Sequence, residues 1–195
     1  MVTGTRAEYG ILHRLINLLN QSDLELRLVV TGTHLSAEHG FTVNEIISDE
    51  HKIDSKIEII TKGDSQLEVG LSLAKAVKKF TNYFTKSSPD IVLILGDRYE
   101  MLGVASAATI CRIPIAHLHG GEITLGAIDE SIRHSITLMS ELDKNNLGNG
   151  LKIFVKKALP LTILTTIFCL IGLYLLNNTY NLNNSILYLV GHSLR

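Results

Sequence analysis

The stretch Pro89–Ala105, PDIVLILGDRYEMLGVA, joins a run of aliphatic residues to a polar turn and then to a helical pattern. A short run of Val, Ile and Leu is typical of a strand that is buried on both faces of a parallel sheet. Pro89 ends the helical pattern that precedes the run. The stretch therefore predicts a strand whose carboxyl end carries Asp97 and Arg98.

Four further segments have the same composition, and with Asp90–Gly96 they make five candidate strands: Met1–Thr3, Leu24–Thr31, Ile53–Thr61 and Ile113–His119. Helical patterns separate them, which predicts an α/β fold with a doubly wound parallel sheet over residues 1–140. Right-handed crossovers favour the strand order 3-2-1-4-5 with helices on both faces. Ligands of such a sheet bind at the carboxyl ends of its strands.

The clearest helical pattern begins with SQLE, residues 65–68, a capping box in which Ser65 and Glu68 satisfy each other's exposed amides. An apolar stripe at steps of three and four continues it: Gly70, Leu73, Val77, Phe80 and Phe84. We expect a helix that ends at Pro89.

Titratable residues follow the candidate strands. Gly4 and the helix start after it make a turn suited to a phosphate, with Arg6 as counter-charge, although a plain strand–helix turn explains them equally well. Asp97 and Arg98 also fit a helix N-cap with a salt-bridge partner.

Two histidines near the last candidate strand raise the question of a metal. His117 and His119 would share one face of that strand, and with Glu122 they mimic a metal site. No third neutral ligand follows at a spacing typical of zinc, so we expect neither a metal nor a cofactor.

Composition narrows the classes of partner and compartment. The chain of 195 residues has a formal net charge of −1, which argues against a nucleic-acid partner. Its two cysteines, Cys111 and Cys169, lie far apart among apolar residues, which favours a reducing cytoplasmic compartment over a disulfide framework. We expect no signal peptide, because Met1 leads within a few residues into a polar loop.

The composition changes after Ser140. Residues 141–157 resemble a polar linker, and Ala158–Leu176 holds 19 residues without a charge, about the length of a helix that crosses a ~30 Å bilayer core. Lysines before this segment predict that residues 1–140 stay in the cytoplasm and that the Asn-rich tail, 177–195, lies on the opposite side of the membrane. A buried core helix is the alternative to this membrane anchor.

Four motifs taken together are similar to one known family: TGTRAEYGIL, VVTGTHLSAEHG, PDIVLILGDRYEMLGVA and PIAHLHGGEITLGAIDESIRHSIT. They resemble the N-terminal half of the UDP-N-acetylglucosamine 2-epimerase family, above all its hydrolysing branch, which forms N-acetylmannosamine for sialic-acid-type sugars. The resemblance runs from Val2 to about Ser140. It implies one half of a two-domain nucleotide-sugar fold that binds a UDP-sugar in the cleft between its domains.

The resemblance also implies a reaction. A proton leaves carbon 2 of the sugar while UDP leaves carbon 1, and the glycal then adds water on the opposite face to give the epimerised free sugar. Acid–base roles carry over to Asp97, to Glu122 and to the Asp129–Glu130 pair, either member of which aligns with the family's acid. A helix N-cap is the alternative for Asp129.

Substrate contacts follow from the same resemblance. Arg6 would stabilise charge on the departing diphosphate, and His34 would line the same pocket. Arg98 and His119 lie at neighbouring strand ends and join the expected contacts. Arg133, with His134 beside it, follows the acids by one turn and would orient them, although a place on the helix surface explains it nearly as well.

The chain departs from the family at both ends. Only Met1 and Val2 precede TGTR, so the first strand is short and its neighbours' amides should be partly unpaired, at a cost in stability. After Ser140 nothing resembles the family's second nucleotide-binding domain, which suits either a shifted reading frame or a gene fusion.

Two functions from different classes follow. The first is an epimerase whose cleft is completed by another chain, as a homo-oligomer or with a complementing second-domain chain. The second is an inactive, membrane-tethered fragment or binding module. The sugar stays open, because the branch that acts on bacillosamine-type nucleotides has similar loops.

Overall fold

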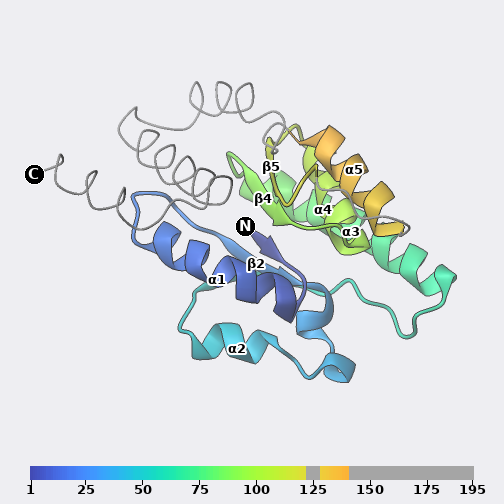
Figure 1. The fold of residues 1–195 in the computed structure, drawn as a ribbon, viewed down its shortest axis with the longest axis horizontal. Coiled ribbons are helices and arrows are strands. Elements are labelled where there is room, and N and C mark those ends of the chain that lie inside the picture. The colour runs from blue at the N-terminus through green and yellow to red at the C-terminus, as the bar shows by residue number, and fades with distance from the viewer. Residues whose placement is uncertain (122–127, 141–195) are drawn as a thin grey trace, which may run out of the picture. The chain divides into compact units, whose positions relative to one another are not determined.

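A computed structural model describes residues 1–121 and 128–140, in which strands and helices alternate along the chain (Figure 1). The elements in order are β1 (Val2–Thr3), α1 (Arg6–Asn20), β2 (Leu28–Thr31), η1 (Gly32–Leu35), η2 (Ala37–His39), α2 (Val43–Ser48), β3 (Ile53–Ile57), α3 (Gln66–Ser87), β4 (Val92–Leu95), α4 (Tyr99–Ile110), β5 (Ile115–Leu118) and α5 (Ile128–Met139). The α/β alternation that the sequence predicts is confirmed.

The strands pair in parallel in the predicted neighbour order, but as two sheets. One sheet has the order β1-β2-β3, and the other joins β4 to β5. β1 lies beside β4, yet within the described residues no ladder connects them, so the prediction of one continuous sheet is wrong in this respect. The physical reason is the length of β1, whose two residues both pair with β2 and offer too little backbone for a second ladder.

The strands are also shorter than their apolar runs. The run Ile53–Thr61 yields a strand that ends at Ile57, although Ile59 is fully buried. Ile59 packs in the core with Phe80 and Met101 without joining a ladder. The apolar runs therefore correctly predicted which segments are buried. The length of each strand depends instead on the strands that pair with it.

Helix α3 confirms the predicted start and end. Ser65 accepts a hydrogen bond from the Glu68 amide with its hydroxyl, at 3.3 Å, and the helix ends at Ser87, two residues before Pro89. Its buried face differs from the predicted stripe, because Ser72 and Ala76 take the places expected for Leu73 and Val77, and Gly70 is exposed. The reason is the packing of α3 against its neighbour α4.

α3 and α4 pack closely because small residues meet at their contact. A Cβ placed on Gly103 would lie 2.6 Å from the Cβ of Ala76, which is closer than side-chain carbons approach one another. The face of α3 that turns inward is therefore the one with small side chains near its start.

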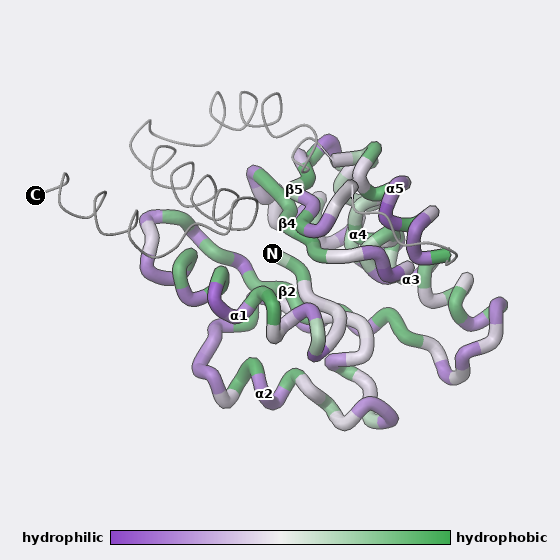
Figure 2. The backbone as a smooth tube through the Cα atoms, viewed as in Figure 1, coloured by the Kyte–Doolittle hydropathy of each residue, from purple (hydrophilic) through white to green (hydrophobic). Residues whose placement is uncertain are grey.

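Two apolar cores lie on the two faces of the strands. Figure 1 shows α1 and α2 on one side and α3, α4 and α5 on the other. Val29 faces the α3–α5 core, and its neighbours Leu28 and Val30 face the α1–α2 core. In Figure 2 hydrophobic and hydrophilic residues alternate along α1, as expected of a helix with one buried face. Helices therefore cover both faces of the strands, as the sequence predicts.

The chain divides into two units, Met1–Leu151 and Lys152–Arg195. Within residues 1–121 and 128–140 we find no helix with the length and apolar character needed to cross a bilayer. The predicted linker 141–157, membrane span 158–176 and tail 177–195 lie outside the described residues.

Candidate active site

A cavity of about 720 Å³ opens at the carboxyl ends of β1 and β4. Its walls come from the start of α1, the segments after β2, β4 and β5, and the first turns of α5. Six residues that the sequence analysis named for the site line it: Arg6, Asp97, Arg98, His119, Asp129 and Arg133. The fold therefore gathers residues that are up to 127 positions apart, from Arg6 to Arg133.

The turns after β1 and β2 touch each other and form one edge of the cavity. Gly32 has a φ of 58°, and a Cβ there would lie only 2.6 Å from the carbonyl oxygen of Gly4. That same oxygen accepts from the His34 amide at 3.3 Å and from the Thr33 hydroxyl at 3.2 Å. Glycine at position 32 is thus required by both its backbone angle and the close approach.

Asp97 is held by Arg133. A guanidinium nitrogen of Arg133, in α5, donates to Oδ2 of Asp97, which follows β4. The two side chains are 11% and 23% exposed, so the contact is a largely buried, charge-assisted hydrogen bond with a fixed direction. The N-cap residue of α4 is Arg98, so Asp97 is not the helix cap that we considered.

Arg98 pairs with Glu100. Its Nη2 lies 2.8 Å and its Nε 3.2 Å from the two carboxylate oxygens of Glu100, whose side chain is fully buried. A buried carboxylate needs such a partner. The positive charge of Arg98 therefore largely compensates the charge of Glu100. We did not single out Glu100 from the sequence, because mostly apolar residues follow it there.

Arg6 lies at the cavity mouth and pairs with Glu45 of α2, with Nε 2.8 Å from Oε1. The Arg6 side chain is 72% exposed. Exposed ion pairs stabilise a protein by only about 0–1 kcal/mol, so an anionic ligand can replace Glu45 at little cost.

His34 is placed differently from the prediction. Its side chain is fully buried, with Nε2 3.1 Å from the Thr3 hydroxyl and Nδ1 2.8 Å from the Thr42 hydroxyl. It is not among the described residues that line the cavity. Burial lowers the pKa of His34 to about 4, so the ring is neutral at pH 7 and ties the β1 end to the segment before α2.

His117 and His119 do not share a face. β5 ends at Leu118, and His119 turns into the left-handed region with a φ of 61° and lines the cavity. His117 is buried, donates from Nε2 to the Gly96 carbonyl at 2.6 Å, and lies with Nδ1 3.2 Å from the hydroxyl of Thr137. His117 therefore joins the ends of β4 and β5 to α5.

Glu8 is a buried acid of the cavity wall that sequence reasoning missed. Its Oε2 accepts from the Gly4 amide at 2.7 Å, and its own amide donates to the hydroxyl of Thr5 at 3.2 Å. Burial, the opposing hydrogen bond from the Gly4 amide and the nearby charge of Glu100 together raise the pKa of Glu8 from 4.5 to about 7, with burial as the largest cause. The signal in the sequence was Thr5-x-x-Glu8, a second capping-box pattern.

The remaining predicted acids differ in where the structure places them. Glu122 lies outside the described residues. Asp129 is in the first turn of α5 and lines the cavity. Glu130 is half-buried, with Oε1 3.6 Å from Nε2 of His134. The described cavity therefore unites Asp97 with Asp129.

The chain is similar in sequence to known proteins. A "GDP/UDP-N,N'-diacetylbacillosamine 2-epimerase (hydrolyzing)" of Campylobacter jejuni is 48% identical over 143 residues, which are 73% of this chain and 37% of the relative. "Polysialic acid biosynthesis protein P7" of Escherichia coli is 42% identical over 142 residues, 72% of this chain and 36% of the relative. The chain thus spans little more than a third of the length of these relatives.

A solved structure supports the fold. UDP-GlcNAc 2-epimerase from Neisseria meningitidis, bound to UDP-GlcNAc, superposes with a TM-score of 0.63 at 21% identity, over 82% of this chain and 43% of that one. The family model described as UDP-N-acetylglucosamine 2-epimerase matches residues 17–145. With the parallel α/β fold and the polar cavity at its strand ends, these matches show that the chain belongs to the UDP-N-acetylglucosamine 2-epimerase family.

Proposed function

We propose that residues 1–140 form one wall of the active site of a hydrolysing UDP-sugar 2-epimerase. The observation that carries the proposal is the cavity in which Asp97, oriented by Arg133, and Asp129 line the same space as Arg6. Carboxylates from two different elements suit a reaction that serves two faces of one sugar ring.

The first step is elimination. A carboxylate removes the proton from carbon 2 of the sugar, the electron pair of that bond forms the double bond between carbons 1 and 2, and UDP leaves with the electrons of the carbon–oxygen bond. This proton is barely acidic, so the base must be held in place before the substrate arrives. The Arg133 contact gives Asp97 such a fixed orientation.

The second step is hydration. Water adds its hydroxyl to carbon 1, and carbon 2 receives a proton on the face opposite the one that lost it, which gives the free 2-epimer. Asp129 or Glu130 acts from the α5 side in this scheme, with Glu122 as a third acid. Arg6 exchanges Glu45 for the diphosphate and stabilises its charge.

The substrate is a UDP-linked 2-acetamido sugar. UDP-N-acetylglucosamine, giving N-acetylmannosamine and UDP for sialic-acid-type sugars, is our first candidate, and a solved relative is bound to UDP-GlcNAc. UDP-N,N'-diacetylbacillosamine is the second, because the Campylobacter jejuni relative is named for it.

The test is release of UDP and of the 2-epimer by the full 195-residue chain, alone and with an added second domain of a homologous epimerase, in D2O. We expect little turnover by the chain alone, since one wall leaves the substrate open to water. With the added domain we expect turnover, with deuterium at carbon 2 of the product.

Two variants make the assay specific. Asp97→Asn should abolish turnover, and Asp90→Asn, at the other end of β4, should retain it. Absence of turnover and of UDP binding with the second domain present would refute the proposal. Equal activity of Asp97→Asn and the unmodified chain would remove Asp97 from the reaction.

A further inference from the structure

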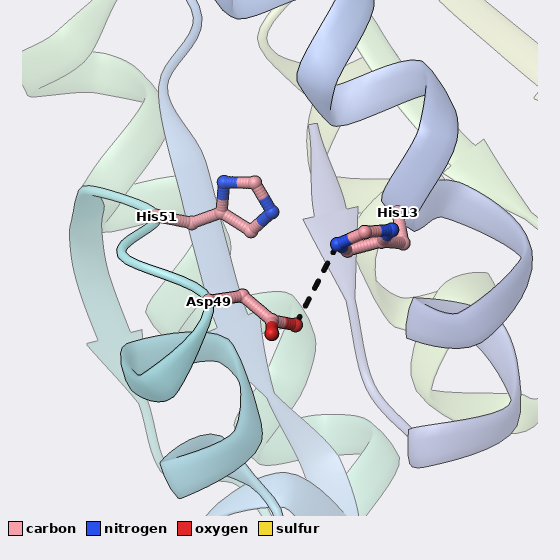
Figure 3. Close-up of side chains that lie close together, drawn as sticks. All are labelled: His13, Asp49 and His51. Atoms are coloured by element: carbon pink, nitrogen blue, oxygen red, sulfur yellow. Dashed lines mark ion pairs between the residues drawn. The ribbon is translucent and has the colours of Figure 1, made fainter.

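A second cluster of titratable side chains lies between α1 and the segment that follows α2. His13 comes from α1, Asp49 is the C-cap residue of α2, and His51 lies just before β3. Figure 3 shows both imidazole rings beside the Asp49 carboxylate. One ligand atom from each of the three residues lies within 4.8 Å of the other two.

The histidines and the acid are close enough to share an ion. His13 Nε2 is 3.6 Å from Asp49 Oδ2, and the centroids of the two imidazole rings are 5.4 Å apart. Ligand atoms around a tetrahedral zinc ion lie about 3.3 Å apart, since each is ~2.0 Å from the metal. The distance between His13 Nε2 and Asp49 Oδ2 is already close to this value, and small rotations of the imidazole side chains bring the other ligand atoms toward it.

His51 supplies independent evidence for a ligand. Its side chain is 9% exposed, and its Nε2 is buried without a hydrogen-bond partner among the described residues. A buried polar nitrogen in that condition is unusual in proteins and costs stability. A metal ion bound to Nε2 removes this cost.

The surroundings also suit metal ligands. Tyr9 donates its hydroxyl to Asp49 Oδ2 at 2.5 Å, which orients the carboxylate. Nδ2 of the Asn20 side chain lies 3.4 Å from His51 Nδ1. A flip of this amide exchanges its nitrogen for its oxygen, so that Nδ1–H donates to the oxygen and Nε2 keeps its lone pair for a metal.

We propose that His13, Asp49 and His51 bind one divalent transition-metal ion, Zn²⁺ above all, with water completing the coordination. Two imidazoles and one carboxylate are ligands that Zn²⁺ accepts and that Mg²⁺ does not prefer.

The ion has a structural role. The three ligands are not among the described residues that line the cavity, so the site is separate from the proposed active site. The ion ties the middle of α1 to the α2–β3 connection, and the first turn of α1 brings Arg6 and Glu8 to the cavity. Metal binding therefore stabilises the helix that builds one cavity wall.

The experiment uses the full chain, free of any histidine tag and stripped with a chelator. Zn²⁺ is titrated calorimetrically, Co²⁺ is followed by its visible absorption, and the melting temperature is recorded with and without Zn²⁺. We expect one ion per chain, the intense visible bands of tetrahedral Co²⁺, and a melting temperature that rises with Zn²⁺ concentration but not with Mg²⁺.

Variants connect binding to these residues. His13→Gln and Asp49→Asn change partly exposed side chains, and each should weaken Zn²⁺ binding at least tenfold while the metal-free melting temperature stays close to that of the unmodified chain. His39→Gln is the matched control, because His39 is an exposed histidine outside the cluster. The proposal is overturned by the lack of saturable binding, or by equal Zn²⁺ affinity in the His13→Gln and unmodified chains.

Discussion

Arg133 donates a hydrogen bond to Asp97 across 36 residues of sequence, whereas Arg98, the neighbour of Asp97 in the chain, pairs with Glu100. Each arginine thus holds one carboxylate, and the two pairs lie side by side at the carboxyl end of β4. Of the two acids, only Asp97 lines the cavity, since Glu100 is fully buried behind it.

The Asp97–Arg133 pair should contribute to stability as well as to the site. Arg133→Gln leaves a largely buried carboxylate without its partner, and we expect a loss of about 1–3 kcal/mol in the free energy of unfolding. Urea denaturation measures it, and a double-mutant cycle with Asp97→Asn isolates the coupling. Arg14→Gln, on the exposed side of α1, should change stability by less than about 0.5 kcal/mol. Additive effects in the cycle would show that the two side chains do not interact in solution.

Glu8 should make the domain less stable as the pH rises. Its pKa is raised by burial from 4.5 to about 7, so the folded state binds more protons than the unfolded state between these values. The stabilisation is complete below pH 4.5 and is lost as the pH rises through 7, and it amounts to about 3 kcal/mol because each tenfold change in proton affinity corresponds to about 1.4 kcal/mol. Denaturation of the unmodified chain and of Glu8→Gln at pH 5 and pH 8 measures it. Parallel pH dependence of the two proteins would contradict the prediction.

His34 should make the domain less stable as the pH falls, which is opposite to the effect of Glu8. Burial lowers its pKa from 6.5 to about 4, so the unfolded state binds the proton first as the solution is acidified. This contribution is complete above pH 6.5 and is lost as the pH falls through 4. We expect His34→Gln to be less stable at pH 7, because it loses contacts with Thr3 and Thr42, and to lose less stability on acidification. A ring-proton NMR titration that places the pKa of His34 near 6.5 would refute the assignment.

The contact between α3 and α4 should not tolerate a methyl group. Gly103→Ala places a Cβ 2.6 Å from that of Ala76, and we expect a loss of about 1–3 kcal/mol. Gly70→Ala is the matched control: Gly70 is exposed in α3 with nothing within 4 Å of the new Cβ, so the change should stabilise the helix by about 0.5–1 kcal/mol.

A second substitution separates packing from other causes. Ala76→Gly in the Gly103→Ala background restores the space between the helices and should recover part of the lost stability, as thermal unfolding would reveal. If the double variant is less stable than both single variants, the loss of stability in Gly103→Ala does not come from the contact with the Cβ of Ala76.

The sequence by itself determined those features that depend on a few neighbouring residues. The start of α3 follows from Ser65 and Glu68, and its end precedes Pro89, because caps and proline act within one turn. The five apolar runs all contain strands, and their alternation with helices allows few parallel topologies. The family, too, was readable from motifs at the strand ends.

Only the tertiary structure decided which distant side chains meet. The sequence offered Arg98 as the partner of Asp97, and packing of α5 supplied Arg133 instead. The burial of Glu8 and the grouping of His13 with Asp49 and His51 were equally out of reach, since the only metal pattern we considered lay around His117. The physical reason is that burial, and the pairing it forces on polar groups, depends on how helices pack across two strand layers. Residues that lie tens of positions apart carry no local signal of that packing.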